Sequence, residues 1–160
     1  MSVALVAAPE PIVRGLSLRD VWCFAVTHLG KRVENRKWNT HHRGPFAIQL
    51  SLGCKPDEHD PEWRWMIERA LVDADSPAYP GFAHRPVGHV VAVSSIVDVV
   101  KKNDPEGVAK IRAHGIDPRW WWPEQYGFLL GPVKLIAPIP CKGAVSLFRL
   151  PADVTARLAA

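Results

Sequence analysis

Cysteine is scarce in this sequence. Cys23, Cys54 and Cys141 lie far apart and form no Cys-x-x-Cys pair, which argues against a disulfide framework or a zinc ribbon. So few dispersed cysteines fit a reducing compartment, and we expect a cytoplasmic protein. A metal ligand set drawn from Cys54 and the acidic and histidine residues at 57–60 is conceivable, but no motif has metal-ligand spacing. We therefore expect neither a metal nor a cofactor.

Long apolar runs and common catalytic motifs are also absent. No run approaches the ~18 apolar residues of a membrane span. The short apolar run at the N-terminus lacks a basic region and is followed by Glu10, so we expect residues 1–14 to be a flexible lead-in, not a signal peptide. The chain has no glycine-rich phosphate loop, serine-hydrolase elbow, Cys-His catalytic signature or recognisable carboxylate pair, which excludes the enzymes that depend on them.

What is present is typical of one globular domain, which we expect over residues 15–160. The chain has 160 residues, of which 48% are hydrophobic and 22% charged, enough for a hydrophobic core. The formal net charge of +4 is a mild basic bias that permits phosphate partners without requiring them. Fifteen prolines divide the chain into short elements, which favours a strand-rich fold over a helical bundle.

Local patterns predict the order of these elements. An apolar stripe at helical spacing follows Ser17, a candidate N-cap, and Gly30 is placed to end that helix in a left-handed conformation. Asp60-Pro61 predicts the start of a second helix. Strands are predicted over residues 33–38, 45–52, 87–100, 126–130, 133–136 and 144–150, and further helices over 104–115 and 151–158. Without regular βαβ alternation, this pattern predicts an α+β fold with a curled sheet or small barrel.

One segment is more specific. Gly30-Lys31-Arg32-Val33-Glu34-Asn35-Arg36, with Arg43-Gly44 a short turn later, resembles the signature of ASCH domains, the activating signal cointegrator-1 homology family of the PUA-like superfamily. The family pattern is Gly-x-Lys-x-x-Glu-x-Arg, and its first glycine falls here at Leu29. Leu16-Ser17-Leu18 looks like the opening strand of that family. The resemblance continues through Ile48–Ser51, Gly88–Val99, Tyr126–Phe128 and the closing hairpin region, and spans roughly residues 16–151.

The resemblance implies a fold and a ligand. The expected fold is α+β, a PUA-like small mixed β-barrel of five to six strands flanked by helices, with a cleft suited to RNA or to a flipped or modified base. Some small members of the family hydrolyse N4-acetylcytidine with a lysine, a threonine three residues later and a distant glutamate. Lys31 matches that lysine, but Glu34 stands at the threonine position, so this activity does not carry over.

The candidate site follows the same segment. Side chains alternate along a strand, so we expect Arg32, Glu34 and Arg36 on one face, with Val33 in the core. Glu34 could fix an arginine that binds a phosphate or a base edge, and Lys31 is a candidate phosphate contact or, when desolvated, a base or nucleophile. The predicted nucleic-acid-binding set is completed by Thr40, Arg43, Ser51 and Tyr126. The alternative is that these charges only form surface pairs.

Three functions remain open. The leading hypothesis is binding of RNA or single-stranded nucleic acid, with some of the seven tryptophans stacking on bases. The alternative is a ribonuclease or modified-nucleoside amidohydrolase with Lys31 and Glu34 as acid and base. The third is a protein-interaction module or homodimer that uses the tryptophan-rich surface. The run Trp120-Trp121-Trp122 cannot point inward at every position, and nothing in the family resemblance explains it.

Overall fold

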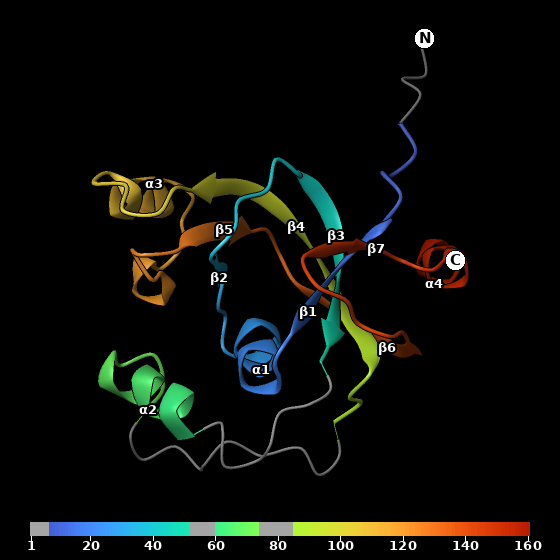
Figure 1. Cartoon of the computed structure of the whole chain (residues 1–160), viewed down its shortest axis with the longest axis horizontal. Coiled ribbons are helices and arrows are strands. Elements are labelled where there is room, and N and C mark those ends of the chain that lie inside the picture. The colour runs from blue at the N-terminus through green and yellow to red at the C-terminus, as the bar shows by residue number, and fades with distance from the viewer. Residues whose placement is uncertain (1–6, 52–59, 74–84) are drawn as a thin grey trace, which may run out of the picture.

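A mixed sheet of seven strands curls around the centre of the molecule (Figure 1). The computed structural model describes residues 7–51, 60–73 and 85–160. The strands are β1 (Arg14–Leu18), β2 (Val33–Arg36), β3 (Gly44–Leu50), β4 (His89–Val100), β5 (Tyr126–Leu130), β6 (Lys134–Pro140) and β7 (Leu147–Arg149). Within these residues, the helices are α1 (Asp20–His28), α2 (Asp60–Glu68), α3 (Gly107–Ala113) and α4 (Ala152–Ala159), with a 3₁₀ turn at Pro118–Trp120.

The long strand β4 organises the sheet. Its residues 90–96 pair with β3, while residues 89–93 pair with β6 and residues 96–100 with β5. The register shifts at three points along these ladders, and such irregularities bend a strand and increase its twist. The strand order is β2-β5-β4-β3-β1-β7, with β6 off this path and paired with β4, and only β1 and β3 are parallel. The bent β4 therefore carries β2 and β1 around toward each other.

The sheet is not closed into a barrel. In the described residues β2 pairs only with β5, and β7 only with β1, so the two ends of the sheet have no backbone pairing with each other. The α+β class is confirmed, whereas five to six strands is an underestimate. The strand that the alternation pattern missed is β1, because Leu16–Leu18 is too short to be separated from the helix that follows, whereas the family resemblance did give an opening strand at these residues. A PUA-like barrel stays a prediction.

Helix α1 lies at the opening of the curl, between the lower ends of β2 and β1 in Figure 1. Its buried Cys23 and Val26 join the core inside the sheet, with Phe46, Ile48 and Phe128. Two smaller clusters cover the outside. One packs α2, α3 and the tryptophan run against β2 and β5, and the other packs α4 against β3, β4 and β6.

Local signals located helix ends well, with one error. Gly30 has φ 75° and follows α1 as predicted, and α2 begins at Asp60. Ser17 is not the N-cap of α1, because it lies in β1 and the helix begins after Arg19 without a side-chain cap. Several predicted strands and helices are a few residues longer than those observed, such as 144–150 against β7. Predictions for residues 52–59 and 74–84 lie outside the described residues.

The run Trp120-Trp121-Trp122 has a structural explanation. Trp120 and Trp121 are buried. Gly107 and Gly127 flank the Trp121 ring so closely that an added Cβ would lie 2.3 Å and 2.8 Å from it, and its indole N–H donates to the Gln125 carbonyl. Only Trp122 turns to a different environment, the candidate site described below.

The structure also bears on membrane-spanning helices and on the segment before β1. Among the helices of the described residues, none is long and apolar enough to cross a membrane. Before β1, residues 7–13 form no helix or strand. Ile12 nevertheless packs against the α4 cluster, and the Val13 carbonyl accepts a hydrogen bond from Leu150.

Candidate functional site

Three charged side chains form a continuous chain at the opening of the sheet. The Lys31 ammonium is 2.9 Å from Glu34 Oε2, and Glu34 Oε1 is 3.1 Å from Arg36 Nε. Lys31 and Glu34 are 2% and 5% exposed, so the pair is buried and does not lie on a solvated face. Arg36 donates its Nη2 to the Ser17 carbonyl of β1 at 2.9 Å. Arg36 thus bridges the gap between β2 and β1, which we call the β1–β2 seam.

Backbone geometry places these groups. The left-handed Gly30 ends α1, and the Lys31 amide donates to the Ala25 carbonyl, so the chain enters β2 directly from the helix. Glu34 and Arg36 then lie two residues apart on one face of β2. Val33 is fully buried on the other face, as predicted. Arg32 lies before β2 and donates to the Val26 and Lys31 carbonyls, so it closes α1 and does not join the predicted charged face.

Burial sets the protonation of the pair. Burial raises the pKa of Glu34, but the charges and hydrogen bonds of Lys31 and Arg36 outweigh it and hold that pKa below the ordinary carboxyl value. Burial lowers the pKa of the Lys31 ammonium, and the Glu34 carboxylate opposes this only in part. Glu34 is therefore the hub, since it neutralises two cations. Neither Lys31 nor Glu34 is exposed enough to contact a phosphate from solvent.

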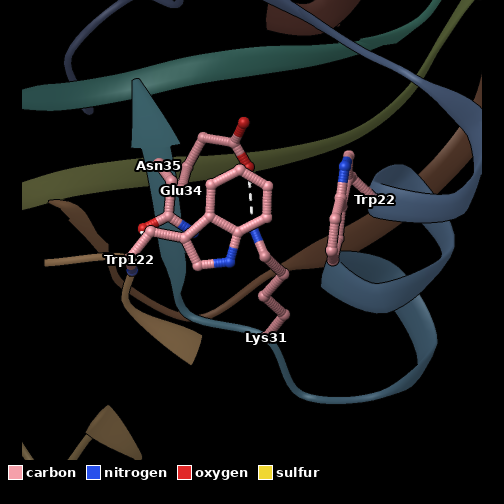
Figure 2. Close-up of a pocket in the computed structure, with 5 residues that line it drawn as sticks. All are labelled: Trp22, Lys31, Glu34, Asn35 and Trp122. Atoms are coloured by element: carbon pink, nitrogen blue, oxygen red, sulfur yellow. Dashed lines mark hydrogen bonds and ion pairs between the residues drawn. The ribbon is translucent and has the colours of Figure 1, made fainter. Parts of the chain in front are cut away.

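A small notch opens beside this pair (Figure 2). It is lined by Trp22, Lys31, Glu34, Asn35 and Trp122 and has a volume of about 50 Å³. The Lys31 ammonium lies 5.3 Å from the centre of the Trp22 ring. The Asn35 side chain accepts from the Trp122 amide and donates to the Trp120 carbonyl, which fixes the backbone that carries Trp122. The volume suits a few waters or a small chemical group, not a nucleobase.

Three tryptophans pack together beside the notch. Trp22, Trp65 and Trp122 meet pairwise, edge to face, with ring centres 5.7 Å apart in each pair. Rings at this separation are in contact, so no base lies between them. The three rings pack on one another, and Trp22 and Trp122 line the notch beside the buried pair. The Trp122 indole N–H is buried and has no hydrogen-bond partner in the described structure.

The other predicted residues do not all converge on this site. Thr40 and Arg43 lie in the β2–β3 turn, where Thr40 accepts from the His42 amide and Arg43 contacts Asp98 of β4 at 3.8 Å. Tyr126 is the β5 partner of Arg36 in the sheet, and its ring packs against the inner core. Ser51 lines a different cavity, together with Ser17 and Gln49. The residues that the seam brings together are Lys31, Glu34 and Arg36.

That second cavity was missed by sequence reasoning, apart from Ser51. Its volume is about 360 Å³, and it is lined by Ser17, Gln49, Ser51, Lys142, Gly143, Ala144 and Val145. The volume falls in the range of about 300–1,000 Å³ in which small-molecule sites are found. A signal existed in the sequence, because Ser17 and Gln49 are polar residues inside the apolar strand segments Leu16–Leu18 and Ile48–Leu50. The contribution of residues 142–145 required the fold.

Within residues 7–51, 60–73 and 85–160, no group of three or more histidine, cysteine or acidic side chains could hold a metal ion. The imagined ligand set around Cys54 lies almost wholly outside those ranges. In comparisons with known proteins, no family model matches the chain and no curated protein matches it.

Proposed function

We propose that this chain binds single-stranded nucleic acid, with RNA as the first candidate, at the β1–β2 seam. The observation that carries the proposal is the anchored guanidinium of Arg36. Its Nε is bonded to Glu34 and its Nη2 to the Ser17 carbonyl, while the contacts within the described structure leave Nη1 for a ligand. The side chain is 22% exposed, so part of it reaches solvent. A fixed fork of this kind suits a phosphate oxygen.

Two further features support the proposal. The second cavity adjoins the seam, because Ser17 lines the cavity with its side chain and accepts from Arg36 with its carbonyl. The ASCH resemblance of residues 30–44 and the net positive charge of the chain point to the same class of ligand. Recognition of a modified base is a finer possibility within this proposal. A notch of about 50 Å³ would admit only a substituent of such a base.

Binding to labelled oligonucleotides tests the proposal. Fluorescence anisotropy with single-stranded RNA and DNA of about 10 nucleotides should show binding at about 50 mM salt that weakens toward 200 mM. Arg36→Gln should weaken it by roughly tenfold to a hundredfold, the equivalent of one lost charge-assisted hydrogen bond. Arg112→Gln, at an exposed position of α3, is the matched control. No binding at low salt, or equal affinities for the two variants, would overturn the proposal.

A second candidate function rests on Lys31. An amine with a lowered pKa, 2.9 Å from a carboxylate and beside a notch, has the components of an acid–base pair. The hydrolase hypothesis therefore stays open, with access to Lys31 only through the notch. Wild type and Lys31→Arg, which keeps the charge, should be incubated with RNA and with acetylated cytidine. Product from wild type alone supports this function, and no product from wild type excludes it for these substrates.

A further inference from the structure

The cavity beyond β1 has a fixed polar floor. Ser17 and Gln49 are register partners on the parallel strands β1 and β3. The Ser17 hydroxyl donates to Gln49 Oε1 at 2.7 Å, and Gln49 Nε2 donates to the Cys141 carbonyl at 3.0 Å. Gln49 is 1% exposed, so a buried amide with defined partners ties the floor to the 141–146 loop. Such a floor is preorganised for a ligand.

Gly143 brings the loop down onto this floor. A Cβ at that position would lie 2.5 Å from both Gln49 Oε1 and Ser17 Oγ, so the site accepts only glycine without a shift. Ser146, near the end of the loop, has φ 60°, a conformation uncommon for a residue with a side chain. The fold thus holds the 141–146 loop in a defined shape above Ser17 and Gln49.

The rim of the cavity combines a cation with an apolar surface. Lys142 is exposed and forms no ion pair with any residue in the described ranges. Ala144 is exposed, and Val145 is 88% exposed, an unusual position for a large aliphatic side chain. Among the described residues that line the cavity, none carries a carboxylate. The lining therefore offers hydroxyl and amide groups below, one free positive charge at the side and an apolar patch at the mouth.

From this lining we infer that the cavity is a nucleotide site. The phosphate pairs with Lys142, the ribose lies against the hydroxyl and amide floor, and one face of the base covers Ala144 and Val145. Inorganic phosphate would leave the apolar rim exposed, and an uncharged nucleoside would leave Lys142 unpaired. The inference deepens the proposed function. It rests on that function where it links the cavity to the seam, because Ser17 lines the cavity and also accepts a hydrogen bond from Arg36. The nucleotide is either a free monophosphate or one unit of a bound strand.

Calorimetric titration with ribonucleoside 5′-monophosphates, nucleosides, ribose 5-phosphate and inorganic phosphate tests the site. A monophosphate should bind at least about tenfold tighter than its nucleoside or than ribose 5-phosphate. Lys142→Gln should remove most of the advantage of the monophosphate over the nucleoside, and Ala144→Trp should abolish binding by filling the mouth. Lys101→Gln and Ala109→Trp, both at exposed positions away from the cavity, are the matched controls. All four variants change exposed residues, and equal melting temperatures would verify their folding.

Oligonucleotide binding by the same variants shows whether the cavity takes a free mononucleotide or one unit of a bound strand. If mononucleotides fail to bind and Ala144→Trp leaves oligonucleotide affinity unchanged, the inference is overturned, while Arg36-dependent binding of strands would still support the proposed function. If Ala144→Trp weakens strand binding, the cavity takes a unit of the strand. If mononucleotides bind in the predicted manner and single strands do not bind, the inference holds and the proposed function fails.

Discussion

The loss in unfolding free energy caused by Glu34→Gln can be estimated directly from the contacts of Glu34. The substitution leaves the buried Lys31 ammonium and the half-buried Arg36 guanidinium without their shared carboxylate. Removing one partner of a buried ion pair typically costs about 3–5 kcal/mol, a large fraction of the roughly 5–15 kcal/mol that stabilises a domain. With a urea slope of about 2 kcal/mol per molar for a chain of this size, the midpoint should fall by about 1.5–2.5 M.

Urea unfolding followed by tryptophan fluorescence measures this shift. Lys31→Met should cost less than Glu34→Gln, because Glu34 keeps Arg36 and the methionine packs among the surrounding tryptophans. Glu124→Gln, an exposed charge-matched control, should leave the midpoint unchanged. A loss below about 1 kcal/mol for Glu34→Gln, or a larger loss for Lys31→Met, would refute the view that Glu34 is the hub of a buried network.

Three further predictions follow. The folded pKa of Glu34 is held below its unfolded value of about 4.3. The stabilising effect of Glu34 is therefore present above that value and is lost as the pH falls through the folded pKa. The difference in urea midpoint between wild type and Glu34→Gln should narrow in acid, and a difference that stays constant with pH would contradict this. Arg119 donates to the backbone carbonyls of Arg69 and Ala70, the two residues that follow α2. Because Arg119→Ala removes these hydrogen bonds, it should speed hydrogen exchange in residues 60–73 and leave exchange in β5 unchanged. Burial raises the pKa of Cys23 to about 12, with Arg85 opposing it, so peptide mapping after iodoacetamide treatment at about pH 8 should find Cys23 labelled only in unfolded protein.

Features governed by short-range chemistry were predicted well. Gly30 is a left-handed residue at a helix end because a missing Cβ makes that conformation accessible. Asp60-Pro61 starts α2 because proline suits the first turn. Tyr126–Leu130 is strand β5 with the predicted bounds. In each case the determining atoms lie within a few residues in the sequence, so the sequence pattern carries the information.

The site depended on contacts that are distant in the sequence. Strand alternation separated Val33 from Glu34, but it could not indicate that the Glu34 face lies inside the curled sheet, where its β5 partner Phe128 and residues of α1 form the inner core, so that Glu34 is buried as well. Ser17 looked like a helix cap because its pairing with β3 is 32 residues away. The cavity joins Ser17, Gln49 and the loop at 142–145, and only the folded sheet brings these segments together.

Ultraviolet crosslinking of bound RNA, with mass-spectrometric identification of the crosslinked peptides, tests the central claim most directly. Binding at the β1–β2 seam predicts crosslinks to peptides containing Arg36 and to the 141–146 loop, and their loss in Arg36→Gln. A basic groove also lies between β6 and α4, where Lys134 and Arg157 line a cavity of about 300 Å³. Crosslinks confined to that groove, or unchanged by Arg36→Gln, would contradict the proposed site.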